Sequence, residues 1–131
     1  MKRVLQPEGW KRSKGYANGI EASGRMVFTA GLIGWNTKEE FESDDLVDQL
    51  RQTLVNTLAI LAESGAGAEH IVRMTWYIIG REDYLTRQKE IGALWKELMS
   101  TNFPCMACVQ VSSLMESRAK IEIETTAIVP H

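Results

Sequence analysis

The sequence is poor in the side chains that hold metal ions. It contains two cysteines and two histidines among 131 residues, and one of the histidines is the last residue, His131. A structural zinc site needs about four ligands of these types. We therefore expect neither a metal nor any other cofactor.

The two cysteines, Cys105 and Cys108, have the spacing C-x-x-C. A redox-active pair of this spacing sits at a helix N-terminus, where the helix dipole lowers the pKa of one thiol. Here the cysteines follow Pro104 and enter a stretch typical of a strand, in which residues three apart point to opposite faces. We interpret them as small core-type residues, not as a disulfide or a redox pair.

The chain also lacks a charge surplus and a long apolar run. The formal net charge is −2, whereas nucleic-acid-binding proteins usually carry a basic patch that displaces counterions. The densest basic cluster, Lys11, Arg12 and Lys14, is interpreted as a solvated N-terminal arm. No stretch reaches the roughly 18 apolar residues of a membrane span, and the first residues do not have the pattern of a signal peptide. We expect no nucleic-acid partner, no membrane partner and a cytoplasmic location.

The composition that remains is typical of a globular domain, with 44% apolar and 24% charged residues. The length fits one domain over residues 1–131. Residues Arg25–Trp35 are rich in β-forming side chains and predict a strand. The stretch 15–22 predicts its partner strand, joined to it by a turn at residues 23–24.

Residues 43–67 predict a helix, because apolar side chains recur there at intervals of three and four and form one stripe. The members of the stripe are Val47, Leu50, Leu54, Leu58 and Leu61. An oxygen acceptor stabilises a helix N-terminus, so Ser43, Asp44 or Asp45 is expected to cap the helix. Gly65 suits the left-handed residue that ends many helices.

A strand over His70–Gly80 and a second helix over 82–100 follow, and the polar Gln88 interrupts the apolar stripe of that helix. Two strands, over Cys105–Leu114 and Lys120–Val129, complete the order ββαβαββ. Each helix is apolar on one side only. This predicts an α+β two-layer sandwich, in which a mixed sheet is covered by two helices on one face. The other face needs cover, and we expect subunit association to supply it.

Alternation along the last two strands assigns side chains to faces of the sheet. Ala107 and Val109 share one face, which we assign to the helix layer. Met106 and Cys108 would then lie on the opposite face, together with Glu122 of the last strand. A carboxylate at such a position is either solvated or part of a pocket, and the pattern alone favours the solvated state.

Several stretches together carry a family resemblance. "FPCMACVQVSSL" and the later "AKIEIETTAIV" are similar to the patterns F-P-A-R-[ST]-x-V-x-V-x-x-L and V-E-I-E-A-I-A, and "VFTAGLIG" is similar to [IV]-[FY]-x-S-G-Q-[IV]. "GYANGI" and the helix "LVDQLRQTLVNTLAILAESGAG" with its following strand also fit. These are the patterns of the Rid family, the reactive intermediate deaminases, also called YjgF or L-PSP endoribonuclease. The resemblance covers the chain from about residue 14 to 129.

The resemblance implies a chorismate-mutase-like α+β fold and a homotrimer with clefts between its subunits. It also implies a chemistry, since active members hydrolyse short-lived enamines and imines to keto acids and ammonia. In these members an arginine of the P-A-R-[ST] motif holds the substrate carboxylate in a bidentate pair. A glutamate of the last strand helps to position water, and a tyrosine near the start lines the cleft. The expected partners are other copies of the chain and a small-molecule ligand.

The family's functional positions are retained in part. The glutamate matches Glu122, the expected catalytic residue, and the early tyrosine matches Tyr16. The positions of the family's serine, glutamine, asparagine and arginine hold, in that order, Ala30, Leu32, Gln88 and Met106. We expect these four residues and Tyr16 to contact substrate. Cys108 is assigned to the same cleft as a neutral thiol, because no neighbouring base is visible that would make it a nucleophile.

Met106 removes the expected carboxylate clamp, since a thioether has no charge and accepts hydrogen bonds only weakly. The loss of a hydrogen bond to a charged group costs about 1.5–3 kcal/mol. Arg118 or Arg73 would have to supply a positive charge from elsewhere.

Three functions are consistent with this pattern. The first is an enzyme that acts on an enamine or imine other than a small imino acid, with Glu122 polarising water. The second is a non-catalytic trimer that binds an apolar metabolite or a protein partner. A ribonuclease is disfavoured, because the chain has no histidine pair, basic groove or metal cluster.

Overall fold

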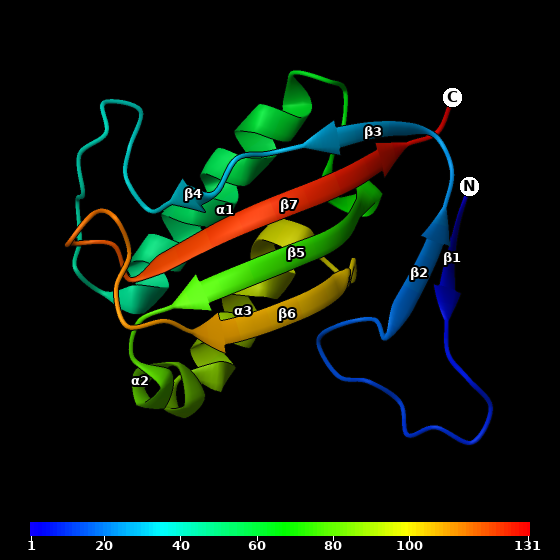
Figure 1. Ribbon diagram of the computed structural model, residues 1–131, viewed down its shortest axis with the longest axis horizontal. Helices are drawn as coiled ribbons and strands as arrows, with labels where there is room; N and C mark the ends of the chain where they lie inside the picture. The colour runs from blue at the N-terminus through cyan, green and yellow to red at the C-terminus, as the bar shows by residue number, and fades with distance from the viewer.

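The computed structural model describes residues 1–131 as a mixed sheet with helices on one face and a separate hairpin beside it (Figure 1). The strands are β1 (Lys2–Leu5), β2 (Gly19–Ala22), β3 (Arg25–Phe28), β4 (Leu32–Ile33), β5 (Ile71–Ile78), β6 (Cys105–Gln110) and β7 (Ile121–Val129). The helices are α1 (Leu46–Ala62), the 3₁₀ turn η1 (Ala68–His70), α2 (Arg81–Thr86) and α3 (Gln88–Met99). The main sheet has the order β3-β7-β5-β6, with β4 also paired to β7. The α+β two-layer prediction is confirmed, with a third α-helix in addition.

Helix α1 begins and ends at signals that the sequence carries. Asp45 caps it, and the Asp45 carboxylate accepts hydrogen bonds from the amides of Val47 and Asp48 at 3.1 and 3.0 Å. Gly65 follows the helix with φ +72°, a left-handed conformation that glycine adopts without strain. The predicted stripe faces the sheet, and its most buried members are Leu50, Leu54 and Leu61.

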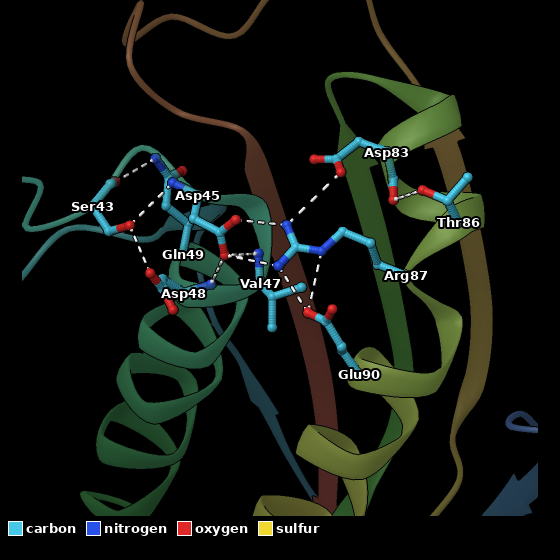
Figure 2. A network of polar contacts seen from close by, with 9 residues as sticks. All are labelled: Ser43, Asp45, Val47, Asp48, Gln49, Asp83, Thr86, Arg87 and Glu90. Atoms are coloured by element: carbon cyan, nitrogen blue, oxygen red, sulfur yellow. Dashed lines mark hydrogen bonds and ion pairs between the residues drawn. The ribbon is translucent and has the colours of Figure 1, made fainter.

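The second predicted helix is two helices that meet at Arg87. Its φ of −116° interrupts the helical backbone. Its guanidinium donates to Asp45 at 2.6 and 3.2 Å and to Glu90 at 2.8 Å (Figure 2). The pair with Asp45 ties the N-terminus of α1 to the junction between α2 and α3. It thereby helps to position Tyr84 and Gln88, which lie on either side of the break.

The predicted pairing of the N-terminal strands is wrong. Strand β2 pairs with β1, not with β3, and the two form a hairpin outside the main sheet. Gly24, with φ +147°, packs closely on the carbonyl of Val129 and turns the chain so that β3 pairs with β7. Strand β1 went unrecognised because all of its residues are exposed, so they show no buried face.

The predicted face assignment of β6 is also wrong. Met106 lies beside Met74 of β5 in the parallel register, and Met74 is fully buried. Met106 packs against the same core, so Met106 and Cys108 point toward the helix layer. Ala107 and Val109 lie on the face without helices. Alternation shows which residues share a face but not which face is covered, and β6 is an edge strand with apolar residues on both sides.

The sheet face without helices, which we call the open face, carries exposed apolar side chains. Met26 and Phe28 of β3 are 61% and 64% exposed, and Val109 of β6 is 44% exposed. Between them, Tyr77 of β5 donates its hydroxyl to Glu124 of β7 at 2.9 Å. The open face therefore combines apolar edges with a polar centre.

Candidate functional site

A pocket of about 660 Å³ lies on the helix side of the sheet, at the start of β6. Four of the predicted substrate-binding residues line it: Tyr16, Gln88, Met106 and Cys108. They come from the N-terminal segment, from α3 and from β6. The structure therefore gathers into one cavity residues that the sequence separates by up to 92 positions.

Tyr16 reaches the pocket because the N-terminal segment is anchored to the start of β6. The amide of Ala17 donates to the carbonyl of Pro104 at 2.9 Å, and Ala17 forms an isolated parallel bridge with Cys105. The Ser13 hydroxyl donates to the carbonyl of Tyr16 at 2.7 Å. Ala17 is buried, whereas the Tyr16 side chain is exposed and borders the cavity.

Aromatic rings make up much of the pocket wall. The rings of Trp95 and Phe103 are stacked, with centroids 6.3 Å apart and planes 13° apart. Trp76 lies 6.0 Å from Trp95 at an angle of 45°. The indole of Trp95 donates to the carbonyl of Asn102 at 3.2 Å, which fixes the orientation of its ring. Trp76 and Trp95 belong to the hydrophobic core.

Three polar residues of the wall, Tyr84, Cys108 and Gln88, are neutral. Burial raises the pKa of the Tyr84 phenol above its ordinary value of 10.0, and the adjacent Cys108 raises it further. Burial also raises the pKa of the Cys108 thiol above 9.0, although contact with Tyr84 opposes this shift. Gln88 donates its side-chain amide to the carbonyl of Tyr84 at 2.9 Å. At neutral pH these groups supply hydrogen bonds but neither a thiolate nor a phenolate.

Several wall residues were not predicted from the sequence: Lys14, Tyr84, Trp95, Lys96 and Phe103. The sequence does carry a helical spacing that points to Lys96. Gln88, Gly92 and Lys96 are spaced at four residues along α3, so they form one side of the helix. The position of Phe103, by contrast, depends on a loop that no periodicity describes.

Glu122 lies away from this pocket. It is the register partner of Tyr77 in β5 and points to the open face, since its neighbours Ile121 and Ile123 are buried under the helices. Its carboxylate packs over Gly31 so closely that a side chain at Gly31 would collide with it. Within one chain, the predicted catalytic residue and the pocket are thus on opposite faces of the sheet.

Ala30 and Leu32 lie near Glu122, not near the pocket. The strand predicted over Arg25–Trp35 is divided into β3 and β4, with Ala30 and Gly31 between them. Leu32 pairs with Ile123 of β7, and Ala30 is exposed. The predicted site residues therefore form two groups, one at the pocket and one around Glu122.

Neither of the two arginines considered as replacements lines the pocket. Arg118 donates to Asp44 at 2.9 Å, and its guanidinium lies 5.5 Å from the centroid of the Phe41 ring. Arg73 is an exposed residue of β5. The charges that do line the pocket are the exposed Lys14 and Lys96.

The structure contains no group of three or more His, Cys, Asp or Glu side chains arranged to hold a metal ion. Both cysteines are free thiols. No helix has the length and apolar character that a membrane crossing requires.

The fold and the pocket define a class of protein: a two-layer α+β domain with an open sheet face and a small-molecule-sized pocket at its parallel edge strand. The chain belongs to the Rid family, also called YjgF. The family model described as endoribonuclease L-PSP matches residues 10–129. The resemblance found in the sequence is confirmed.

Known proteins of the family are similar over nearly the whole chain. The 2-iminobutanoate/2-iminopropanoate deaminase of Salmonella typhimurium is 34% identical over 113 residues, which cover 86% of each chain. The solved structure of the Rid protein of unknown function YyfB from Yersinia pestis has a TM-score of 0.85 at 29% identity, with 98% of both chains covered. Escherichia coli TdcF, solved with bound serine, has a TM-score of 0.70 at 29% identity and covers 97% of this chain and 98% of its own.

Proposed function

We propose that the chain forms a homotrimer that binds a small metabolite in the helix-side pocket and hydrolyses an enamine or imine there. The observation that carries the proposal is the convergence of Tyr16, Gln88, Met106 and Cys108 on one cavity. Its volume of about 660 Å³ is in the range of small-molecule sites. The name of the deaminase relative, which refers to 2-imino acids, supports imine chemistry.

The proposal requires Glu122 to act on the pocket of a neighbouring subunit, because the two lie on opposite faces within one chain. The open face supports association, since Met26, Phe28 and Val109 expose apolar surface there. In a closed ring of identical subunits each chain offers one surface to its first neighbour and a different surface to its second. Each active site would then combine the pocket of one chain with Glu122 of the next.

The proposed reaction consumes one water. The Glu122 carboxylate takes a proton from water as the water oxygen bonds to the imine carbon. The proton passes to the nitrogen and gives an amino alcohol. A second proton then moves from its hydroxyl group to the nitrogen as the C–N bond breaks, so that ammonia leaves and the carbon becomes a carbonyl. No oxidant or reductant enters the balance. Tyr77, which neighbours Glu122, donates to Glu124 instead, so it does not occupy the Glu122 carboxylate.

Met106 selects against small imino acids in this proposal. A small substrate has its carboxylate as its main binding group, and the methionine offers that group neither a charge nor a strong donor. A larger and less polar imine can bind through apolar contact with the aromatic wall instead.

The test compares two freshly generated imines, iminopyruvate and the imine of phenylalanine, with semicarbazide trapping the imine that remains. We expect acceleration of the larger imine, a near-uncatalysed rate for iminopyruvate, and loss of acceleration in Glu122→Gln. Uncatalysed rates for both imines would contradict the enzymatic function.

A non-catalytic trimer that binds an apolar metabolite is the second candidate. Two observations favour it: the pocket wall has the apolar Met106, and Glu122 lies on the opposite face of the sheet. Gly92 lines the pocket, and a Cβ atom added there would meet no other atom within 4 Å. Gly92→Trp should therefore fill the cavity without disturbing the fold. For this candidate, metabolites would raise the melting temperature of the parent and of the control Ala93→Trp but not of Gly92→Trp, with no imine hydrolysis.

A further inference from the structure

The aromatic wall of the pocket offers flat, rigidly held surfaces. Five aromatic side chains line the cavity: Tyr16, Trp76, Tyr84, Trp95 and Phe103. Trp95 is held by its hydrogen bond to the carbonyl of Asn102 and by stacking on Phe103. Faces of this kind favour a planar ring, which can stack against them or meet them edge-on.

A glycine in the middle of α3 leaves room for such a ring. Gly92 has ordinary helical geometry, and an added Cβ would meet nothing within 4 Å. Neither backbone conformation nor close packing therefore requires glycine, although glycine is unfavourable in a helix interior. The missing side chain instead leaves open space on the α3 wall, beside Ile91 and Trp95, which also line the cavity.

The charges on the wall are of one sign. Lys14 and Lys96 are the only charged residues that line the pocket, and no carboxylate does. The acidic residues of α3 are already engaged, since Glu97 pairs with Arg51 at 2.6 Å and Glu90 pairs with Arg87 at 2.8 Å. Lys96 is therefore left without an acidic partner on its own helix and is available to an anionic ligand.

We propose that the pocket binds a planar aromatic carboxylate, with its ring against Trp95 and Phe103 and its carboxylate toward Lys14 and Lys96. The inference rests on the proposed function, because it concerns the same pocket, and it names the class of ligand. Met106 of β6 has no charge to offer the carboxylate. The positive charge comes instead from Lys14 of the N-terminal segment and Lys96 of α3.

Isothermal titration with three probes separates the contributions of ring and charge. Indole-3-acetate has both, indole-3-acetamide keeps the ring without the charge, and acetate keeps the charge without the ring. The lysines are exposed, so we expect the acid to bind up to about fivefold more tightly than the amide. Acetate should give no measurable heat at the same concentration.

Two matched lysine variants on α3 locate the charge. Lys96→Met should remove part of the preference for the acid and leave the affinity for the amide unchanged. Lys89→Met is the control, because Lys89 is exposed on the same helix and does not line the pocket. Gly92→Trp should abolish binding of both indoles.

Three binding results would overturn the inference: equal affinity for the acid and the amide, affinity for acetate as high as for the acid, or no binding of either indole at millimolar concentration. An equal effect of Lys96→Met and Lys89→Met would also overturn it. Imine hydrolysis measured on the same preparations distinguishes this failure from that of the proposed function. Hydrolysis that persists without a preference for the acid removes only the ligand class, whereas loss of both hydrolysis and binding removes the proposed function as well.

Discussion

Met106, which the sequence comparison predicts to replace the family's arginine, lies in the pocket wall together with Cys108 and Gln88. Its neighbour across the sheet is the buried Met74. A side chain at this position therefore reaches the pocket from beneath the helices. In the proposed function, this thioether makes the pocket less polar than one that holds a carboxylate with an arginine.

Met106→Arg should restore binding of small carboxylates. A guanidinium can form a bidentate, charge-assisted pair with the substrate carboxylate, so hydrolysis of iminopyruvate should rise by about tenfold or more. The rate is measured by trapping the remaining imine, with Met106→Leu as the control that changes shape without adding charge. Equal rates in the two variants would show that position 106 does not contact the substrate carboxylate.

The site residues could be predicted individually but not as an arrangement. Tyr16, Gln88, Met106 and Cys108, which the sequence assigns to substrate binding, line one cavity, and their contact with substrate stays a prediction. The wrong assignment concerned Met106 and Cys108, which were placed on the same face as Glu122, because period-two alternation leaves open which side of the edge strand β6 is covered. The aromatic wall was missed because it depends on contacts between a loop and helices that are distant in sequence.

At the scale of elements, the junction between α2 and α3 depends on a contact that local patterning cannot contain. The apolar periodicity continues on both sides of residue 87 and is interrupted only by the polar Gln88, so the pattern predicts a single helix over 82–100. The break is stabilised by the ion pair between Arg87 and Asp45, residues 42 positions apart (Figure 2). The caps of α1, by contrast, were predicted correctly because they involve only residues next to the helix.

Asp45→Asn should reduce the acid sensitivity of the fold. The hydrogen bonds from Arg87, followed by those from the backbone amides, hold the pKa of Asp45 below its ordinary value of 3.8. A lowered folded-state pKa means that the stabilisation is complete above the unfolded-state value and is lost as pH falls through the folded-state value. Urea unfolding between pH 7 and pH 2.5 should therefore show a shallower loss of stability below about pH 4 in the variant.

Asp45→Asn should still lose some stability as pH falls, because Asp44 and Glu97 also have pKa values lowered by arginine partners. Asparagine keeps an acceptor for the helix amides, whereas alanine does not, so Asp45→Ala should be less stable than Asp45→Asn by about 1 kcal/mol at pH 7. A pH profile of Asp45→Asn that matches the parent would show that the Arg87 pair contributes nothing to folding.

At the scale of the whole molecule, the layer order was predictable and the surfaces were not. Helix and strand periods defined one covered sheet face, and the buried residues of β5 and β7 lie on it. The hairpin of β1 and β2 was not predictable, because it packs outside the sheet and exposes most of its residues (Figure 1). The proposed trimer likewise depends on surfaces that are exposed in a single chain and leave no mark on its internal periodicity.

The most direct test mixes two inactive chains. Glu122→Gln keeps an intact pocket, and Gly92→Trp keeps an intact glutamate. Each variant alone should be inactive toward the imine of phenylalanine, with a mass three times the 14.8 kDa of one chain. After joint refolding at equal amounts, random assembly should restore about one quarter of the parent rate, because that share of sites pairs a sound pocket with a neighbour's sound glutamate. No recovery from a mixture confirmed to contain mixed trimers would contradict a site shared between subunits.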